Sequence, residues 1–499
     1  MMQNVFVEVR ERTARAGLRG YRLLALTGAA LAYFMVQLGM VPVAITLPTV
    51  AREFQVDIAQ AGWAMTAYLL VLAALALPAG RLGDILGYHR VFFVGVVVYG
   101  AATVLTGFAG SMAQFIALRA VQGIGGAILL GTTFAITANA VPESMRGRAV
   151  ASTAMAASVG SMIGSTTAGL AVTYLNWRWT FFFLLPIAVV TAKIAWDMAR
   201  SAPSTTERRS TRIDIPGTVL FVGVLVTLVL SLNHLHEGPE TFEAGWGYHT
   251  TMQVLAAVLL ALLLVVESRA IEPLLILRHF RNGLFSSALA ANIVLHITMA
   301  SIFFLLPFVI QRGMVLPPLY ISSALVARQI LDISAPALSG WLYDRTHSRL
   351  IRPIGMAVIC SSILTMGLLA TELSYVGLVV MTVLTGFGSG FFVTTNNTVI
   401  LSALPQGERG FATGMLETTR QLGHTVAVVV VTAAMGLALG GQDSGAVLPR
   451  TYLEGFRYAC FAVAATSAAG IVLASLATRR MRALAEKQAP VPAGVRSGE

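Results

Sequence analysis

The chain has 499 residues, of which 56% are hydrophobic and 11% charged, and its mean hydropathy is +0.76. A soluble protein carries about 25% charged residues, so this composition excludes an aqueous globule and requires lipid as the solvent. The net charge of +11 does not indicate nucleic acid, because the basic residues are sorted by loop. We therefore expect an all-α membrane protein with no nucleic-acid partner.

Residues 1–22 are rich in arginine and precede the first long apolar run. A cleavable signal peptide is the weaker interpretation, because the run is long and many more follow. A bilayer crossing needs about 20 apolar residues, and the chain holds about fourteen such runs. They lie at 23–47, 60–79, 91–109, 111–140, 148–173, 179–199, 215–233, 251–268, 284–311, 319–342, 351–371, 374–403, 411–438 and 456–477.

Basic residues gather in alternate loops between these runs. One set of loops contains the arginines at positions 81, 90, 146, 148, 345 and 409 and the basic tail that starts at 479. The other loops hold few arginines, and one of them, at 237–243, is acidic. By the positive-inside rule the basic set faces the cytoplasm. We expect a multi-pass protein of the inner or plasma membrane with both termini cytoplasmic.

A short polar turn occurs twice. Residues 80–90 read Gly-Arg-Leu-Gly-Asp-Ile-Leu-Gly-Tyr-His-Arg, and a weaker copy, Gly-Trp-Leu-Tyr-Asp-Arg, begins 260 residues later at position 340. Two more pairs, Gly123 with Gly386 and Pro142 with Pro405, are each 263 residues apart. Loops that repeat in the same order at a near-constant offset predict two homologous halves.

The repeat offset is longer than six spans need, so we expect two inserted spans between the halves. The predicted organisation is an N-terminal segment (1–22), a six-helix bundle (23–200), a linker (201–213), two inserted transmembrane helices (214–270), a second six-helix bundle (271–480) and a cytoplasmic tail (481–499). The linker and the tail are polar, which is typical of segments without a core. The predicted fold thus has about 14 transmembrane helices.

These features resemble the 14-span drug:proton antiporter branch of the major facilitator superfamily. Besides the turn and the layout, the resemblance rests on Trp177-Arg178-Trp179, Asp214…Pro216-Gly217 and Glu267…Glu272-Pro273-Leu274…Phe280-Arg281-Asn282. It implies alternating-access transport of a small molecule between two rocking bundles, driven by a proton gradient, with no cofactor and no enzymatic activity. We expect a monomer to function, and a periplasmic adaptor protein is left open as a partner.

Three positions differ from the pattern of that branch. Its first span reads Leu-Asp-x-Thr, whereas this chain has Leu38-Gly39-Met40-Val41, so the membrane-buried aspartate is missing. Its fifth-span motif, Gly-Pro-x-x-Gly-Gly, is Gly164-Ser165-Thr166-Thr167-Ala168-Gly169 here. Ile85 stands where an arginine is usual in the first turn. One alternative is therefore an exporter or facilitator of one metabolite or lipid without the usual proton coupling, and another is a protein on this scaffold that transports nothing.

Ionisable side chains inside the spans are candidates for function, because a charge at mid-bilayer is costly. By the resemblance, Arg119 matches an arginine used in coupling; alternatively it bonds backbone carbonyls between helices. Glu417, Arg420, Gln421 and His424 share one helical face. Glu417 can exchange a proton beside Arg420, or the two form a self-neutralised pair.

Further candidates lie in other spans. Arg328 and Asp332, four residues apart on one face, form an ion pair or line the substrate site. Gln37 and Asn396 are candidates for a central cavity, and His296 is expected to be a hydrogen-bonded core residue. No His/Cys spacing indicates a metal site.

Glycine spacing supplies the last candidates. The gating turn comprises Gly80, Gly83, Asp84, Gly87 and Arg90, with Gly340, Asp344 and Arg345 in the second copy. Glycines permit a tight turn, and Asp84 is placed to accept hydrogen bonds from a helix N-terminus of the other half. In the fifth span, Gly160, Gly164 and Gly169 predict a small-residue face for close helix packing.

Overall fold

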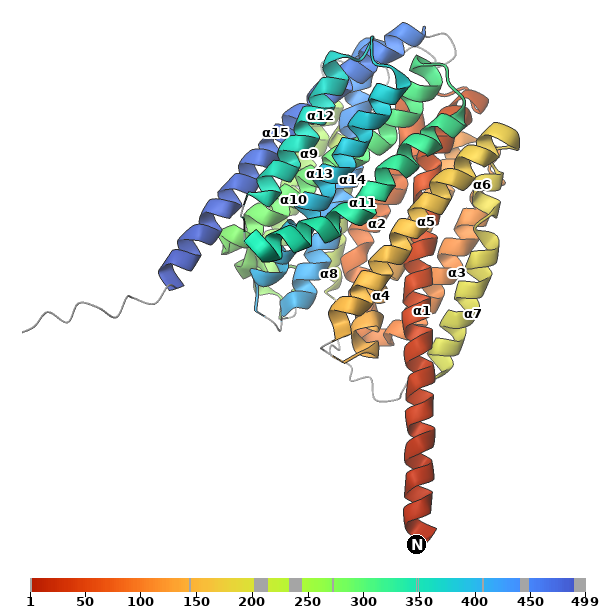
Figure 1. Cartoon of the computed structure of the whole chain (residues 1–499), viewed down its shortest axis with the longest axis vertical. Helices are drawn as coiled ribbons and strands as arrows, with labels where there is room; N and C mark the ends of the chain where they lie inside the picture. Colours follow the sequence, from red (N-terminus) through yellow and green to blue (C-terminus); the bar gives the residue numbers. More distant parts are fainter. Residues whose placement is uncertain are drawn as a thin grey trace, which may run out of the picture.

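The computed structural model is built from helices (Figure 1) and describes residues 2–142, 145–201, 214–232, 245–271, 273–346, 348, 350–405, 408–439 and 448–488. The helices are α1 (Met2–Glu53), α2 (Ile58–Leu86), α3 (Tyr88–Thr106), α4 (Met112–Ala140), α5 (Arg146–Tyr174), α6 (Trp179–Phe182), α7 (Leu185–Ser201), α8 (Ile215–Leu232), α9 (Trp246–Arg269), η2 (Leu277–Arg281), α10 (Gly283–Phe308), η3 (Val309–Gly313), α11 (Pro318–Thr346), α12 (Ile351–Leu368), α13 (Tyr375–Ser402), α14 (Arg409–Leu439) and α15 (Pro449–Gln488). Most of the predicted linker (201–213) and the last part of the tail lie outside the described residues.

The helices agree with a multi-pass membrane protein. Within the described residues, 12 segments are long and apolar enough to cross a bilayer. Two more predicted spans are helices that fall outside this group: α8 is apolar but short, and α11 is less apolar because it carries charged residues such as Arg328 and Asp332. Each run predicted from the sequence therefore coincides with a helical segment, and 12 of these segments qualify as spans by length and composition.

Two elements differ in detail from the predicted ranges. The predicted N-terminal segment 1–22 is not separate, because α1 begins at Met2 and continues as one helix to Glu53. The predicted sixth span is divided into α6 and α7. Pro186 stands in the first turn of α7, a position that suits a residue without a backbone N–H, and it ends the preceding helix.

The two halves repeat the same helix crossings. α4 packs on α2 and α3, and in the same way α13 packs on α11 and α12. A Cβ at Gly123 of α4 would lie 2.7 Å from the Tyr68 carbonyl oxygen of α2. A Cβ at Gly386 of α13 would lie 2.8 Å from the Arg328 carbonyl oxygen of α11. Glycines at the same offset in the sequence thus permit equivalent close approaches in each half.

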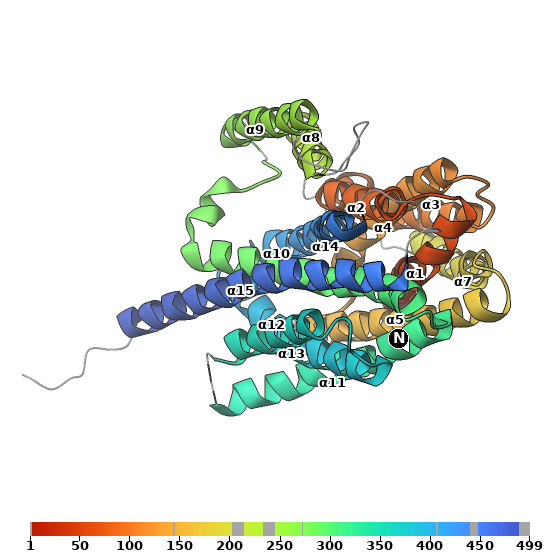
Figure 2. The same cartoon turned by 90° about the horizontal axis from the view of Figure 1, so that it is seen from above.

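The halves meet along two pairs of helices, α2 with α14 and α5 with α11. The hairpin of α8 and α9 lies outside the two bundles, and α8 packs against α2 and α14 (Figure 2). Phe221, Leu225 and Val229 of α8 share an apolar cluster with Leu70 of α2. The inserted pair therefore covers one edge of the contact between the halves.

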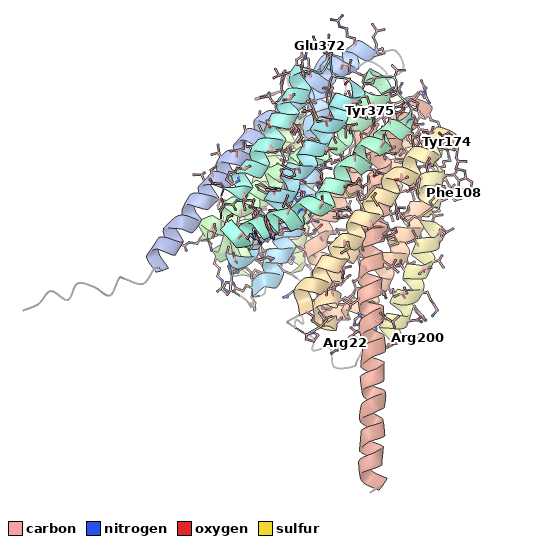
Figure 3. All side chains as sticks on the ribbon, viewed as in Figure 1. Arg22, Phe108, Tyr174, Arg200, Glu372 and Tyr375 are labelled. Atoms are coloured by element: carbon pink, nitrogen blue, oxygen red, sulfur yellow. The ribbon has the colours of Figure 1, made fainter. Side chains whose placement is uncertain are left out.

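The bundle has two ends that differ in their side chains (Figure 3). Arg22 and Arg200 lie at the end from which the start of α1 projects, which we call the terminal side. Tyr174, Glu372 and Tyr375 lie at the other end, which we call the opposite side. The spans run between these two sides.

The glycines of α5 face two different helices. A Cβ at Gly160 would overlap the Phe34 carbonyl oxygen of α1, and a Cβ at Gly164 would lie 3.1 Å from the Pro42 ring. Gly169 instead faces Ser322 of α11, in the other half. The glycines predicted to form one packing face therefore serve two contacts, one within the first half and one between the halves.

Candidate functional site

A buried arginine lies in the middle of α4. Arg119 is 1% exposed, and its guanidinium donates to the carbonyl oxygens of Ala64 (3.3 Å) and Gly39 (3.4 Å). It also donates to the side-chain oxygen of Gln122, and its Cζ lies 4.1 Å from the ring centroid of Tyr68, a cation–π contact. Arg119 thus joins α4 to α1 and α2 through uncharged groups.

The glycine that replaces the first-span aspartate packs directly against this arginine. A Cβ at Gly39 would lie 3.0 Å from Nε2 of Gln122 and would overlap the hydroxyl of Tyr99. The Tyr99 hydroxyl donates to the Val36 carbonyl oxygen at 2.9 Å. Nε2 of Gln122 donates to Oγ1 of Thr103 at 2.6 Å. Hydrogen-bonded groups of α3 and α4 therefore fill the space that a side chain at position 39 would need.

One face of α14 carries the charged stripe predicted from spacing. Glu417 is 5% exposed, and its Oε2 lies 3.3 Å from Nη1 of Arg420. Its Oε1 accepts a hydrogen bond from Nε2 of Gln421 at 2.6 Å. The Arg420 side chain is 28% exposed and thus remains partly accessible. The buried carboxylate has one cationic and one neutral partner on its own helix.

His424, two turns further along this face, meets His296 of α10. Nδ1 of His296 lies 3.2 Å from Nε2 of His424, and the rings are T-shaped with their centroids 5.0 Å apart. Only one of the two nitrogens donates in this bond, so the tautomer of one ring fixes that of the other. His296 is hydrogen-bonded as expected, but to a candidate residue. Sequence reasoning missed the pair because 128 residues separate its members.

Arg328 and Asp332 form a second ion pair on α11, with Nη1 and Oδ2 3.4 Å apart. Arg328 is 2% exposed, and its Cζ lies 4.6 Å from the ring centroid of Phe303 in α10. Its Nη2 contacts the sulfur of Met299 at 2.8 Å. Oδ1 of Asp332 accepts from the Ser389 hydroxyl of α13 at 2.6 Å. The pair therefore links three helices of the second half.

Side chains of both halves come together at these clusters. Tyr33 of α1 interacts electrostatically with Glu417 and Arg420, and Tyr68 of α2 interacts with Glu417. Since Tyr68 also covers the guanidinium of Arg119, polar contacts connect the arginine of α4 with the carboxylate of α14. Arg420 and Arg328 in turn both act electrostatically on His424. We call this set the central cluster (Tyr33, Tyr68, Arg119, His296, Arg328, Asp332, Glu417, Arg420 and His424).

The two remaining cavity candidates differ in their surroundings. Gln37 is half-buried and lies one turn after Tyr33 on α1, so it shares the helical face that meets the central cluster. Asn396 is 1% exposed, donates to the Ala288 carbonyl oxygen at 3.1 Å and accepts from Nη1 of Arg352 at 3.3 Å. Those bonds hold α10, α12 and α13 together, which is a packing environment. In the part of the chain that the structure describes, no three His, Cys, Asp or Glu side chains are arranged to hold a metal.

Glycines shape the turn between α2 and α3. Gly87 has φ of +92°, a conformation that favours glycine. A Cβ at Gly80 would lie 3.3 Å from the backbone of α4, and one at Gly83 would lie 2.6 Å from the Tyr88 ring. Asp84 accepts a hydrogen bond from the Tyr88 hydroxyl. Its partner in this conformation is thus local, in place of the predicted helix terminus of the other half.

The second copy of the turn is less constrained. Gly340 has no atom within 4 Å of the position that a Cβ would take. Cζ of Arg345 lies 4.3 Å from the ring centroid of Trp341, and the side chain of Asp344 is outside the described set. Arg90, at the end of the first copy, is exposed. The steric role of the first copy's glycines is therefore not repeated at Gly340.

Hydrogen bonds join the two halves on the opposite side. Gln311 accepts from the Thr49 hydroxyl at 3.3 Å and donates to the Ile45 carbonyl oxygen at 3.2 Å. Nη2 of Arg312 donates to the Pro48 carbonyl oxygen at 3.4 Å. Both donors lie in η3, a π-helical turn that extends α10, and such turns are frequent at functional sites. In this conformation α1 and η3 are thus fastened to each other.

The serine that replaces the fifth-span proline supplies another contact between the halves. Oγ of Ser165 accepts from Nε2 of Gln329 at 3.0 Å, and its carbonyl oxygen accepts from the Ser322 hydroxyl at 2.6 Å. A proline has no hydroxyl and could not accept from Gln329. Spacing along α5 did not reveal this role, because it does not show which helix the residue faces.

Comparison with known proteins agrees with this arrangement. A sequence model of the Major Facilitator Superfamily matches residues 29–428. The chain belongs to this superfamily. A bacterial homologue of the human lysosomal transporter Spinster, crystallised in an inward-facing and unoccupied conformation, has the same superfamily fold, with a TM-score of 0.66 at 14% identity over 94% of this chain and 99% of that one.

Curated superfamily relatives are named as transporters and as export or resistance proteins. The riboflavin transporter RibZ of Clostridioides difficile (strain 630) is 25% identical over 76% of this chain and 80% of that protein. The tetracenomycin C resistance and export protein of Streptomyces glaucescens is 28% identical over 86% and 78%. The multidrug resistance protein Stp of Mycobacterium tuberculosis (strain CDC 1551 / Oshkosh) is 27% identical over 83% and 76%. These relatives support transport as the activity of this superfamily member.

Proposed function

We propose that the chain is a secondary-active exporter of drugs or other hydrophobic and amphipathic small molecules, driven by the proton gradient through alternating access. One observation carries the proposal: Glu417, a carboxylate that is 5% exposed, lies where α14 meets Tyr33 and Tyr68 of the first half. A carboxylate at this depth persists for a reason. Proton exchange at a contact between moving halves is such a reason.

The proton acts through the ion pair of Glu417 and Arg420. The charged carboxylate holds Nη1 of Arg420 at 3.3 Å. Protonation removes that attraction and frees the guanidinium to change its partners, which shifts the balance between two arrangements of α14 and α2. Substrate and proton then occupy the site in alternation. The gradient supplies the driving force, so no cofactor is needed.

The conformational change is a rocking of the halves. In this conformation Gln311, Arg312 and Ser165 carry hydrogen bonds between the halves toward the opposite side. Opening that side requires these bonds to break, while the terminal side closes through the turn at 80–90. Asp84 then exchanges Tyr88 for a donor in the other half.

We place the protein in the inner or plasma membrane as a 14-span monomer with both termini cytoplasmic. The positions of Arg22 and Arg200 on the terminal side support this orientation, because basic residues favour the cytoplasmic face. α8 and α11 supply the two spans beyond the 12 segments that qualify by hydropathy. A periplasmic adaptor protein remains open as a partner.

Reconstituted vesicles test the coupling. A drug-susceptibility profile of cells that lack or overproduce the protein first supplies a transported compound. With that compound and a pH-sensitive dye inside the vesicles, we expect substrate-triggered proton release by the native chain and none by Glu417→Gln. Glu372→Gln, at an exposed carboxylate on the opposite side, is the matched control and retains the signal. Coupled transport that survives in Glu417→Gln would contradict the proposal.

The second candidate is an exporter or facilitator of one metabolite or lipid without the usual proton coupling. The environment of Gly39 favours it, because the position of the missing aspartate is filled by Tyr99 and Gln122. The riboflavin transporter among the relatives is an example of a protein named for a single metabolite. Flux that does not change when the pH gradient is collapsed would support this candidate and exclude the first.

A further inference from the structure

The central cluster contains buried hydrogen-bond donors without acceptors. Nε and Nη1 of Arg328 have no hydrogen-bond partner, although the residue is only 2% exposed. Nε of Arg420 and Nδ1 of His424 are also buried and unpaired. Buried polar groups are almost always hydrogen-bonded, so each exception needs an explanation. Three side chains from two helices present such exceptions here.

The nearby acceptors are already engaged or poorly placed. Oδ2 of Asp332 is 3.4 Å from Nη1 of Arg328, close enough for an ion pair but not aligned as a hydrogen bond. Its Oδ1 accepts from Ser389. The other neighbours of the Arg328 guanidinium, the Met299 sulfur and the Phe303 ring, are a weak acceptor and an apolar face. The protein therefore leaves hydrogen-bonding capacity at this place unused.

The charge of the cluster is unfavourable for a cation. Arg119, Arg328 and Arg420 face two carboxylates, Asp332 and Glu417, which leaves one positive charge in excess. The described partners of Arg119 are carbonyl and amide oxygens and an aromatic ring. A cationic ligand would meet this excess charge in a medium of low dielectric constant.

The site is reachable and has an aromatic wall. The side chains of Arg420 and Asp332 are 28% and 26% exposed, and Phe303 is half-buried. The Phe303 ring lies against the Arg328 guanidinium, so a flat ring system placed beside it would bring its own oxygen atoms toward Nε and Nη1. Planar groups suit the fixed donor geometry of arginine.

We propose that Arg328, Arg420 and His424 form a substrate-recognition site for uncharged aromatic compounds that carry carbonyl oxygens, and that this site selects against cations. Such a compound supplies the missing acceptors without adding positive charge. The inference rests on the proposed export function and names its substrate class. It also departs from the cationic drugs that the resemblance to the antiporter branch implies.

Three probes with the same three-ring outline test the inference on the full-length protein in lipid nanodiscs. N-Methylacridone is neutral and has a carbonyl, N-methyl-9,10-dihydroacridine is neutral without one, and N-methylacridinium is cationic. Their own fluorescence reports equilibrium binding. We expect the acridone to bind about 10-fold or more tightly than the other two, because a hydrogen bond to a charged donor contributes about 1.5–3 kcal/mol.

Variants tie the preference to the site. Arg328→Lys loses the planar fork, so the acridone preference falls about 10-fold while binding of the dihydroacridine is retained. Arg450→Lys, at a side chain that is 84% exposed, is the matched control and keeps the preference. Should Arg328→Lys fail to elute as a single species, His424→Phe removes one donor and keeps a ring, and it lowers the preference about 3-fold or more.

The outcomes separate this inference from the export function. Equal binding of the three probes, tighter binding of the acridinium, or no binding of any probe overturns the inference. A preference that survives both Arg328→Lys and His424→Phe does so as well. Export itself is judged by vesicle flux of the compound from the susceptibility profile, so flux without this preference leaves the proposed function standing and removes only the substrate class.

Discussion

Replacing Ser165 by alanine is expected to shift the protein toward the conformation that is open on the opposite side. The change removes the bond from Nε2 of Gln329 to Oγ of Ser165, which is 3.0 Å long, and keeps the bond from Ser322 to the carbonyl oxygen. Gln329 is 3% exposed, so its donor loses an acceptor that water cannot easily replace. The closed arrangement alone is therefore destabilised.

The magnitude follows from this single bond. Side-chain hydrogen bonds between membrane helices contribute about 0.6 kcal/mol on average, and those in soluble proteins about 1 kcal/mol. At room temperature this range corresponds to about a 3- to 5-fold rise in the ratio of open to closed molecules. A larger effect would indicate that Gln329 finds no other acceptor in the closed state.

Double electron–electron resonance measures that ratio. Spin labels are attached at Asn176 in the first half and Glu372 in the second, in a chain whose Cys360 and Cys460 have been replaced. The fraction of long distances on the opposite side should rise about 3- to 5-fold in Ser165→Ala. Ser152→Ala is the control, because the Ser152 hydroxyl donates within its own helix, to the Ala149 carbonyl oxygen.

The reasoning is refuted by either of two results. An unchanged distance distribution in Ser165→Ala means that the bond does not favour the closed state. A shift of equal size in Ser152→Ala means that any serine of α5 has the same effect. A double-mutant cycle with Gln329→Leu should show non-additive effects, because both residues belong to one bond.

Two other predictions concern stability and can be read from thermal unfolding of the purified protein. Gly386→Val should lower the stability by about 1–3 kcal/mol, because its Cβ would lie 2.8 Å from the Arg328 carbonyl oxygen, whereas Gly340→Val, with no atom within 4 Å, should not change it; equal losses would contradict this reading of the repeat. Gly39→Asp should destabilise the protein because its Cβ would overlap the Tyr99 hydroxyl, and Tyr99→Phe in the same chain should restore part of the loss. A stable Gly39→Asp variant that gains nothing from Tyr99→Phe would show that the space at position 39 is not limiting.

The spans and the repeat could be predicted because they depend on local properties. A run of about 20 apolar residues must cross a bilayer wherever it lies in the chain. Gly123 and Gly386 were paired by offset alone, and the structure places both against the equivalent helix of their half. The charged stripe of α14 was also accessible, because residues three, four and seven apart share a helical face.

The partners of these residues could not be predicted in the same way. In a membrane protein the lipid-facing and interior faces are both apolar, so periodicity does not show how a helix is rotated. His296 was therefore separated from His424, and Gly169 was assigned to the same contact as Gly160, although the two face different halves. Asn396 was grouped with the cavity, although its bonds lie between packed helices.

The amino-acid sequence by itself determined that this chain crosses a membrane many times and does so in two similar halves, because hydropathy and motif spacing are properties of single segments. Only the tertiary structure decided that Tyr68 covers Arg119 while acting on Glu417, and that Ser165 fastens α5 to α11. These contacts join residues that are distant in the chain. They depend on the rotation and depth of each helix against its neighbours, which close packing of side chains settles and hydropathy does not.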